Sequence, residues 1–508
     1  MATQWYQYRL FLAVGLVCTA ATWAFAEEDG AEEPTESPQP SPSASLTVTD
    51  NASSGEPAYL ASTAALNKAV VGSHKGVFYD NNFGYLCDPC YTDWRLGDNL
   101  KRMAIGDSIT LDIGGQYRLR QHAERNMRNL AGVGLGLTGN DDDFLLHRTR
   151  IYANAEIGSR LRVYAEMLDA VSNYENTLPR GIEENRAELQ NLFVDAVAMD
   201  SYDGTLTARF GRQELLYGNQ RVVSPLDWAN TRRTFDGVKL LWEGQDWDVD
   251  GFWARPLRRD VVQVDPPNLD REMYGLYSTY KGLSCTNVDL YWLALDFHDA
   301  GFLYDTFGAR LWGDRDSWLY EFEGAFQVGQ NADGSNHSAG AFTLGVGKKF
   351  DCALWTPTLW LYYDWASGDD TAGNGYHHYQ PLAHKYLGFM DLFGRRNLED
   401  ANVLLTMKPH EKLKLLFWYH IFRMQNINDV PYNVDMSRFA AATVAPGTAG
   451  SRELGEELDA VATFLISPRV NLLFGYSHFF AGDFYATTPG VPYNGDADFF
   501  YTQLHVNF

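Results

Sequence analysis

The sequence lacks the long apolar runs of a helical membrane protein. After residue 26 it contains no uninterrupted apolar segment of roughly 18 residues, the length that a membrane-spanning helix needs, and its mean hydropathy is −0.31. A search for long apolar runs does not detect a transmembrane β-barrel, because barrel strands alternate lipid-facing apolar residues with lumen-facing polar residues. A bundle of membrane-spanning helices is therefore excluded, and a barrel is not.

Basic residues are also scarce. The chain of 508 residues has 41 Lys and Arg against 65 Asp and Glu, which gives a formal net charge of −24 at pH 7. A protein that binds nucleic acid needs a basic face to neutralise phosphates. We therefore expect no nucleic-acid partner.

Cysteine is rare, with five in the chain, one of which (Cys18) lies in the apolar N-terminal stretch. Cys87 and Cys90 form an isolated C-x-x-C pattern, which could be a redox motif or half of a metal site. In an exported chain without a second such pair, the simpler interpretation is a local disulfide or two inert thiols.

The N-terminus predicts export. Arg9 supplies a positive charge, residues 10–21 are apolar, and residues 24–26 form a small-x-small cleavage site, so residues 1–26 are expected to be a signal peptide. One alternative is an uncleaved anchor helix, for which the apolar run is short. The other is a lipidated Cys18, which lacks a small residue just before it.

Two further segments are predicted before the main domain. Residues 27–57 are rich in Pro, Ser and acidic residues and contain no Lys or Arg, so we expect a disordered spacer. Residues 58–108 contain the C-x-x-C pattern and are expected to form a periplasmic or plug-like lead-in segment. Residues 109–508 are expected to form an outer-membrane β-barrel.

The composition favours strands and tight turns. The chain has 29 Tyr, 29 Phe, 14 Trp and 45 Gly but only 19 Pro; aromatic side chains suit a pleated half-buried surface, and Gly permits tight reversals. From residue 109 onward, segments of about ten residues alternate with period two between Gly, Asn, Asp and Pro clusters. We predict 18 strands, at 109–121, 144–157, 161–170, 187–197, 205–215, 234–243, 246–255, 271–281, 286–296, 304–312, 317–328, 340–350, 357–367, 398–408, 412–423, 455–466, 469–481 and 498–508.

An even strand number fits a single-chain barrel of the bacterial outer membrane, because both ends then lie on one side and no sheet edge stays open. The predicted connections alternate between short ones, such as 158–160, which would face the periplasm, and long ones, such as 368–397, which would face outward or fold into the lumen. A soluble β-sandwich would also alternate.

Three features favour the membrane over the sandwich: the strand number, the aromatic surplus and a chain that ends on Phe508 within a strand. Such a terminal aromatic residue resembles the signal that barrel-assembly machinery recognises. The fold class is therefore predicted to be all-β, a transmembrane antiparallel up-and-down barrel of about 18 strands in the cell outer membrane, in contact with outer-membrane lipid.

Arginines are frequent at alternating strand positions. A charge on the lipid face costs about 2–4 kcal/mol at the midplane, so these side chains should point inward, where a guanidinium can bind carboxylates with two hydrogen bonds. Alternatively, or in addition, they pair with the lumen acids Glu156, Glu166, Glu321, Glu323, Glu457 and Asp459 and hold the wall rigid. The residues expected to line the pore and contact cargo are Arg118, Arg120, Arg148, Arg150, Arg209, Arg221, Arg233 and Arg310.

The sequence carries no recognisable catalytic motif. A hydrolase would need a grouped Ser, His and carboxylate, and a lyase a His or Tyr near a neutralising Arg or Asn. No G-x-S-x-G elbow is present. The histidines that could serve are spread along the chain: His384, His420, His478 and His505. The protein is therefore predicted not to be an enzyme and to hold no cofactor.

One pair of histidines, His377 and His378, lies in the longest predicted connection. With Asp369 or Asp370 this pair could hold a metal ion, but a solvated loop is the simpler interpretation. We predict no metal site.

Several motifs resemble the alginate-export family of outer-membrane porins. The most specific is residues 211–222 (GRQELLYGNQRV), continued by residues 227–238 (DWANTRRTFDGV). Residues 114–120, 363–369 and 475–483 also fit, so that the resemblance extends from about residue 109 to the end. It implies an eighteen-stranded barrel with an arginine-lined constriction that conducts a negatively charged polymer.

Three functions follow as expectations. The first is a porin-like channel for an anionic, polyuronate or alginate-like poly- or oligosaccharide. The second is a structural barrel that tethers the cell surface layer through the acidic spacer. The third is a barrel-embedded polysaccharide hydrolase or lyase.

Overall fold

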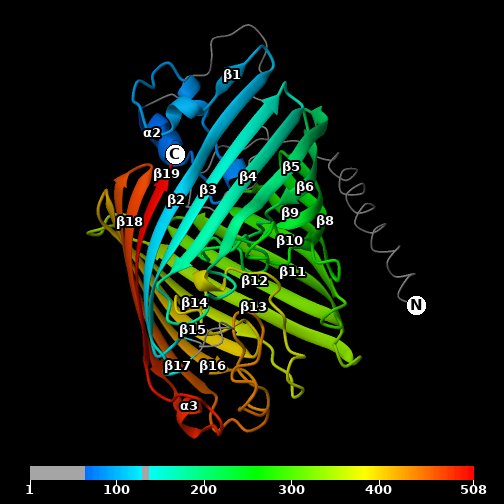
Figure 1. Cartoon of the computed structure of the whole chain (residues 1–508), viewed down its shortest axis with the longest axis vertical. Coiled ribbons are helices and arrows are strands. Elements are labelled where there is room, and N and C mark those ends of the chain that lie inside the picture. Colours follow the sequence, from blue (N-terminus) through cyan, green and yellow to red (C-terminus); the bar gives the residue numbers. More distant parts are fainter. Residues whose placement is uncertain (1–62, 129–136) are drawn as a thin grey trace.

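A ring of antiparallel strands forms the wall of the molecule (Figure 1). The computed structural model describes residues 63–128 and 137–508. Within these residues, strands β2 to β19 each pair with the next strand along the chain, and β19 (Ala497–Asn507) pairs with β2 (Ile109–Arg125). That pairing closes a barrel of 18 strands, which confirms the predicted fold class.

Each of the 18 predicted strands overlaps one observed strand. The observed strands are mostly longer, as β5 (Asn185–Ser201) is compared with the predicted 187–197, because backbone pairing continues past the alternating residues. The other strands are β3 (Asp142–Ile157), β4 (Leu161–Asn173), β6 (Gly204–Gln213), β7 (Phe235–Gly244), β8 (Trp247–Pro256), β9 (Arg271–Leu283), β10 (Thr286–Phe297), β11 (Phe302–Arg315), β12 (Trp318–Gln330), β13 (Asn336–Lys349), β14 (Thr358–Ala366), β15 (Leu398–His410), β16 (Leu413–Met424), β17 (Glu453–Ser467) and β18 (Val470–Ala481).

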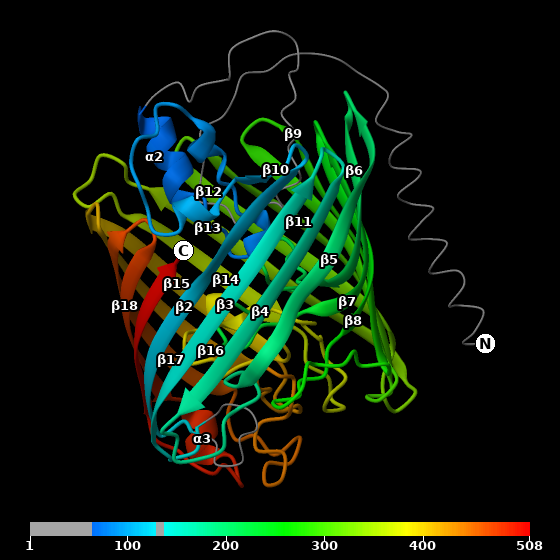
Figure 2. The same cartoon turned by 45° about the horizontal axis from the view of Figure 1, so that its top comes forward.

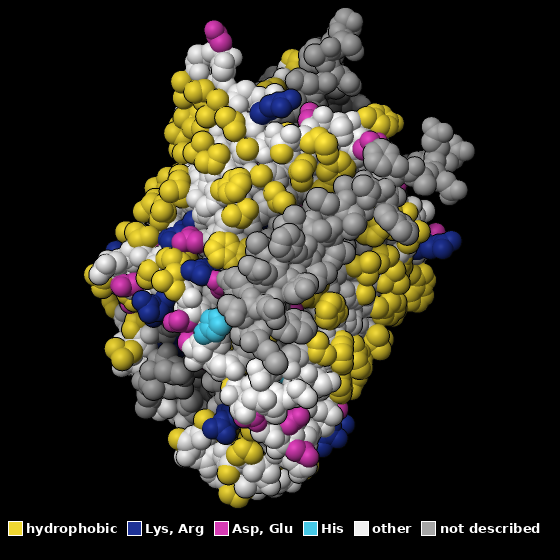
Figure 3. Space-filling view, turned by 90° about the vertical axis from the view of Figure 1, so that its right-hand side faces the viewer, with side chains coloured by type: hydrophobic (Ala, Val, Ile, Leu, Met, Phe, Trp, Pro, Cys, Tyr) yellow, Lys and Arg dark blue, Asp and Glu magenta, His cyan; other side chains and the backbone are white. Residues whose placement is uncertain are grey.

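Side chains alternate between the outside and the lumen. In β12, Glu321 and Glu323 are buried inside the barrel, whereas Phe326 is 54% exposed on its outer surface. In β19, Tyr501 points inward and Phe500 outward. Broad hydrophobic areas therefore cover the wall seen in Figure 3. This apolar outside and polar inside is the arrangement that a membrane barrel requires.

The two ends of the barrel differ in the length of their connections. Short turns such as 158–160 and 316–317 lie at one end, and the long connections 174–184, 367–397 and 425–452 lie at the other, as predicted. In outer-membrane barrels the short turns face the periplasm and the long connections face the cell exterior. We call these the periplasmic end and the outer end.

The described residues contain two α-helices, α2 (Thr63–Val71) and α3 (Asp483–Thr487), and neither is long and apolar enough to cross a membrane. α2 and the short strand β1 (Met103–Ile105), which pairs with β2, lie at the periplasmic end near the C-terminus, and α3 lies at the outer end (Figure 2). Short 3-10 helices span Phe78–Asp80, Gly84–Cys87, Asp98–Leu100 and Ala383–Lys385. The predicted signal peptide and acidic spacer lie outside the described residues.

Three segments enter the lumen. The β6–β7 connection (214–234) and the β14–β15 connection (367–397) meet there, since Val223 forms a parallel bridge with Gln380. The ring of Trp228 stacks on that of His384 with centroids 3.6 Å apart. The third segment precedes β2, and its residue Phe78 packs inside the wall against Tyr152.

Candidate functional site

An arginine cluster holds the β6–β7 connection inside the barrel. Arg118 and Arg148 face each other on the paired strands β2 and β3. Arg118 donates from Nη1 to the Asp227 carbonyl oxygen at 2.7 Å, and Arg148 donates from Nη2 to Asp227 Oδ1 at 2.8 Å. Arg120, two residues along β2, donates to the Trp228 carbonyl oxygen at 2.8 Å. Three strand arginines therefore point at one short piece of backbone.

The same piece of backbone is fixed by stacking and by further donors. The guanidinium of Arg120 lies 3.7 Å above the Trp228 ring, an arrangement stabilised by cation–π attraction. Arg118 and Arg148 also both donate to the Ala229 carbonyl oxygen. The acceptors of these arginines are mostly carbonyl oxygens, which carry only partial charge.

Positive charge exceeds negative charge in this cluster. Two more arginines join it: Arg150 lies 2.5 Å from Glu166 and 3.9 Å from Glu214, and Arg232 binds Glu214 and Asp227. The cluster thus contains five arginines and three carboxylates, and only Arg148, Arg150 and Arg232 contact a carboxylate directly. Such an excess in a water-poor setting attracts anions.

The arginines of the cluster lower the pKa of Asp227. Burial alone would raise the pKa of this carboxyl, but Arg148, Arg232 and Arg118 together hold its pKa well below the ordinary value. Asp227 therefore stays ionised throughout the physiological range.

Other predicted pore residues are paired with carboxylates elsewhere on the wall. Arg209 Nε lies 2.7 Å from Asp195, which also binds Arg162. Arg310 binds Asp289 at 3.0 Å and Glu321 at 2.9 Å. These buried ion pairs fit the alternative role expected from the sequence, in which the arginines pair with lumen acids and hold the wall rigid.

The two predicted residues of the β6–β7 connection differ in their partners. Arg221 Nη1 lies 3.0 Å from Asp364 in β14. Arg233 donates to the Pro381 carbonyl oxygen at 2.7 Å and forms no ion pair with a described residue. Burial lowers the pKa of Arg233 to about 10, so the group remains charged at neutral pH. Of the eight predicted arginines, the fold brings together Arg118, Arg120, Arg148 and Arg150, and it places Arg209, Arg221, Arg233 and Arg310 elsewhere.

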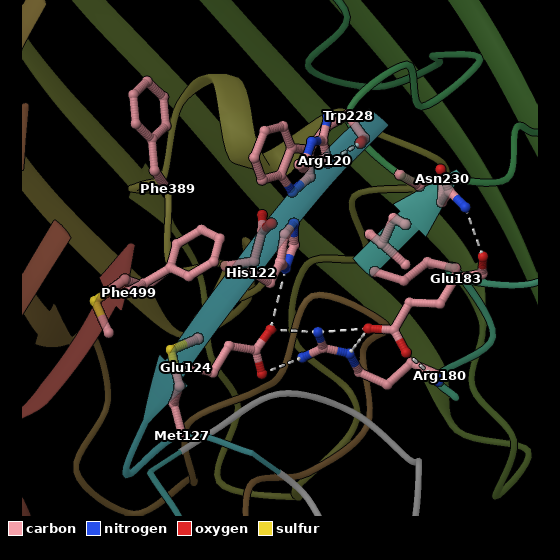
Figure 4. A pocket seen from close by; sticks show the side chains of 15 residues that line it. Arg120, His122, Glu124, Met127, Arg180, Glu183, Trp228, Asn230, Phe389 and Phe499 are labelled. Atoms are coloured by element: carbon pink, nitrogen blue, oxygen red, sulfur yellow. Dashed lines mark hydrogen bonds and ion pairs between the residues drawn. The ribbon is translucent and has the colours of Figure 1, made fainter. Parts of the chain in front are cut away.

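Little free space remains beside the cluster. A cavity of about 20 Å³ lies between Arg120, Trp228 and the connections of the outer end, which is room for about one water molecule. Figure 4 shows the guanidinium of Arg180 between Glu124 and Glu183, which closes one side of this cavity. The inward connections thus leave no room for a sugar ring in this cavity.

Aromatic residues before β2 cover the cluster from the periplasmic end. This contact was not predicted from the sequence. The Phe78 ring lies 3.8 Å from the Arg150 guanidinium, and the Tyr79 ring 4.5 Å from that of Arg209. The Tyr79 hydroxyl donates to the Glu214 carbonyl oxygen at 2.8 Å. The short apolar run Val77-Phe78-Tyr79 was the sequence signal for this contact.

The prediction that His377 and His378 lie in a solvated loop was wrong. The β14–β15 connection fills the lumen, so that His378 is only 2% exposed, and burial lowers its pKa to about 3. Its Nε2 lies 3.0 Å from the Val434 carbonyl oxygen. Across residues 63–128 and 137–508, no three His, Cys, Asp or Glu side chains converge as metal ligands.

The other sites raised by the sequence remain separate from the cluster. Cys87 and Cys90 are exposed free thiols. Of the candidate histidines, His384 is hydrogen-bonded to Asp391 within the β14–β15 connection, and His420 on β16 is hydrogen-bonded to Asp400 on β15. The other two lie on different strands: His478 on β18 and His505 on β19.

Comparison with known proteins agrees with this architecture. A family model described as alginate export matches residues 109–495. Among solved structures, Acinetobacter baumannii OccAB2 superposes with a TM-score of 0.53 at 10% identity and covers 78% of this chain and 98% of its own. Acinetobacter baumannii OccAB1 (0.52, 12%, 78% and 96%) and Pseudomonas aeruginosa OpdO (0.51, 12%, 78% and 97%) are similar.

These structural likenesses, at such low identity, show the fold. No curated protein sequence matches the chain. The family match covers most of the barrel, including the β6–β7 connection and the arginines that hold it. The chain is a porin-like outer-membrane β-barrel and belongs to the alginate export family.

Proposed function

We propose that the protein is a channel through which an anionic poly- or oligosaccharide of the polyuronate class crosses the outer membrane. One observation carries the proposal: Arg118, Arg120 and Arg148 are aimed at the lumen, and backbone carbonyl oxygens of residues 227–229 occupy their donor groups. A carboxylate accepts from guanidinium groups more strongly than a neutral carbonyl does. A uronate can therefore replace the connection.

The charge balance supports the same cargo. The chain as a whole carries −24, and exposed charges are screened within about 8 Å at physiological salt, so only a local cluster can favour anions. The excess of arginine around Asp227 supplies one. Arg150, Arg209, Arg221 and Arg310 are proposed to line the path while their carboxylate partners fix their positions, and Arg233 is proposed to contact cargo.

Passage requires the connections to move. The cavity beside Trp228 holds about 20 Å³, which is too small for a sugar ring. The contacts that must open are the hydrogen bonds to residues 227–229 and the stacking of Trp228 on His384. Barrel strands need not rearrange, since the wall holds residues 227–229 through side chains of β2 and β3 and not through strand pairing.

Ion selectivity of the purified protein in planar bilayers tests the proposal. We expect the wild-type channel to prefer chloride over potassium and to be blocked by a mannuronate oligomer. Arg118→Gln combined with Arg120→Gln should reduce both effects, because the excess positive charge is lost. Arg315→Gln, an exposed arginine at a periplasmic turn, is the control. A wild-type channel without anion preference would contradict the proposal.

A further inference from the structure

Two adjoining cavities lie at the outer end of the barrel, and the smaller one borders the arginine cluster at Arg232. The larger, about 350 Å³, is bounded by the β10–β11 hairpin and by the β14–β15 and β16–β17 connections. The smaller, about 250 Å³, is bounded by the β6–β7 and β8–β9 connections. Arg271, the first residue of β9, lines both. Together they reach the size of an ordinary small-molecule site, roughly 300–1,000 Å³.

Each cavity contains an arginine whose charge has no carboxylate partner among the described residues. In the smaller cavity this is Arg233, which donates to the Pro381 carbonyl oxygen. In the larger it is Arg396, which is 5% exposed and donates from Nε to the Tyr376 carbonyl oxygen at 2.8 Å. A buried guanidinium normally has an ionic partner. Both arginines are therefore prepared to bind an anion.

The two arginines are held by one short piece of chain. Tyr376 and Pro381 belong to the same connection, so their carbonyl oxygens fix one arginine on each side of it. The acids nearby have other partners: Asp299 binds Arg271 at 2.8 Å, and Asp435 accepts from the Ser437 amide at 2.9 Å. Asp265 accepts from the Asn185 amide group at 2.9 Å, and Asp429, whose charge reaches Arg396, accepts from the Tyr432 hydroxyl at 2.7 Å. None of the four forms an ion pair with Arg233 or Arg396.

The larger cavity also has an aromatic wall. The Phe302 and Tyr304 rings stack with centroids 4.5 Å apart at an interplanar angle of 19°, and Phe297 packs on Phe302 at 5.1 Å. Phe302 is only partly buried. A flat apolar surface of this kind can bury the apolar face of a sugar ring, while the arginines bind its charged substituents.

We propose that these two cavities form a binding site at the outer mouth for consecutive acidic sugar residues. One carboxylate pairs with Arg396, the next pairs with Arg233, and a pyranose ring packs on Phe302. The site rests on the proposed cargo class; it borders the central cluster at Arg232, but its two anion contacts, Arg233 and Arg396, are not members of that cluster. It gives the outer mouth an affinity for the polymer that does not depend on the closed centre.

Calorimetric titration of the full-length mature protein in detergent tests the site. The probes are tetramannuronate and its neutral counterpart mannotetraose, which differ only in the carboxylates. We expect Arg233→Gln to weaken tetramannuronate binding about tenfold, as the loss of one charged hydrogen bond implies, and to leave mannotetraose unchanged. Phe302→Ala should weaken both oligomers about threefold to tenfold.

Two matched controls lie at the same end outside both cavities. Arg186→Gln removes an exposed arginine paired with Asp169, and Tyr174→Ala removes an aromatic side chain that is 82% exposed. Both should bind like the wild type. If Arg233→Gln or Phe302→Ala fails to fold, as judged by circular dichroism, Arg233→Lys and Phe302→Leu replace them, each with a smaller loss in the same direction.

Equal wild-type affinity for the two oligomers would overturn the site, as would unchanged tetramannuronate affinity in Arg233→Gln and Phe302→Ala. The channel proposal is read separately, from the ion preference of the Arg118 and Arg120 variants. If the Arg118 and Arg120 variants lose the anion preference while Arg233→Gln and Phe302→Ala bind tetramannuronate like the wild type, the channel proposal stands and the outer site is contradicted.

Discussion

Acceptor type divides the lumen arginines into two groups at the scale of single residues. Arg209 and Arg310 face ionised carboxylates in the wall, and each is buried. Arg118 and Arg120 face carbonyl and amide oxygens instead. The first kind of contact is costly to break, because a buried charge is left alone. The second can be exchanged for a ligand.

Asp195 shows the cost of breaking a buried pair. It is 1% exposed and binds both Arg162 and Arg209. Asp195→Asn leaves two buried guanidinium groups without a negative charge, so we expect a loss of about 3–5 kcal/mol in the free energy of unfolding. Urea unfolding in detergent measures it. Asp203→Asn, at an exposed turn, should change little, and equal effects of the two substitutions would contradict this role.

Lys385 makes the closed arrangement depend on pH. Burial lowers its pKa from 10.5 to about 8, against the opposing attraction of Glu321. The closed state thus binds fewer protons than a solvated, open state between these values, and its stability should rise as pH increases from about 8 to 10.5. Bilayer conductance should fall over this range.

Lys385→Met provides the control for that pH effect. It carries no titratable group at this position, so its conductance should decline less between pH 8 and 10.5 than that of the wild type. A wild-type conductance that rises with pH would reverse the expected sign and contradict the burial of a charged ammonium group here.

At the scale of elements, the sequence predicted the strands well and the inward segments poorly. Period-two alternation located all 18 strands because the lipid and lumen impose it on every one. Residues 214–234 and 367–397 carry no such periodicity, since their contacts are with distant strands. The alternation of short and long connections left open whether residues 368–397 face outward or fold into the lumen, so the burial of His378 was not predicted.

The same limit applies to the site residues. That strand arginines point inward follows from the cost of charge in lipid. Which acceptor each one meets depends on register and on the inward connections, as for Arg118 and Asp227, and a single sequence does not contain that information.

The β6–β7 connection can be tested as an element. Replacing residues 226–230 by a Gly-Ser segment of equal length removes the Trp228 ring and leaves β6 and β7 paired along their whole length. We expect a larger single-channel conductance and an unchanged circular dichroism spectrum. A Gly-Ser replacement of residues 445–448, all of them exposed, is the control. Unchanged conductance in the first variant would show that the connection does not close the lumen.

At the scale of the whole molecule, the ring and the segment before it are separable. Strand pairing closes through β19 and β2, whereas β1 adds only three residues to β2. The segment is attached mainly by side chains: Arg469 binds Asp98 at 2.8 Å, and Arg162 donates to the Tyr79 carbonyl oxygen at 2.8 Å.

Deletion of residues 63–102 should therefore leave a folded barrel with a wider periplasmic mouth. We expect barrel-like circular dichroism, a higher conductance and an unchanged anion preference, because Arg118 and Arg120 remain. Arg469→Gln should give a smaller increase in conductance, since it loosens the segment without removing it. An unfolded deletion variant would show that the segment is part of the folding unit.

The pairing of the final strand with the first has one more consequence. Phe508 and Gly115 exchange backbone hydrogen bonds at 2.9 and 3.0 Å, so the polypeptide comes back to its own starting point after one circuit. A circularly permuted gene that connects Phe508 through a short linker to Ile109, the first residue of β2, and opens at the tight turn 316–317 would encode the same wall, with a different strand emerging last from the ribosome.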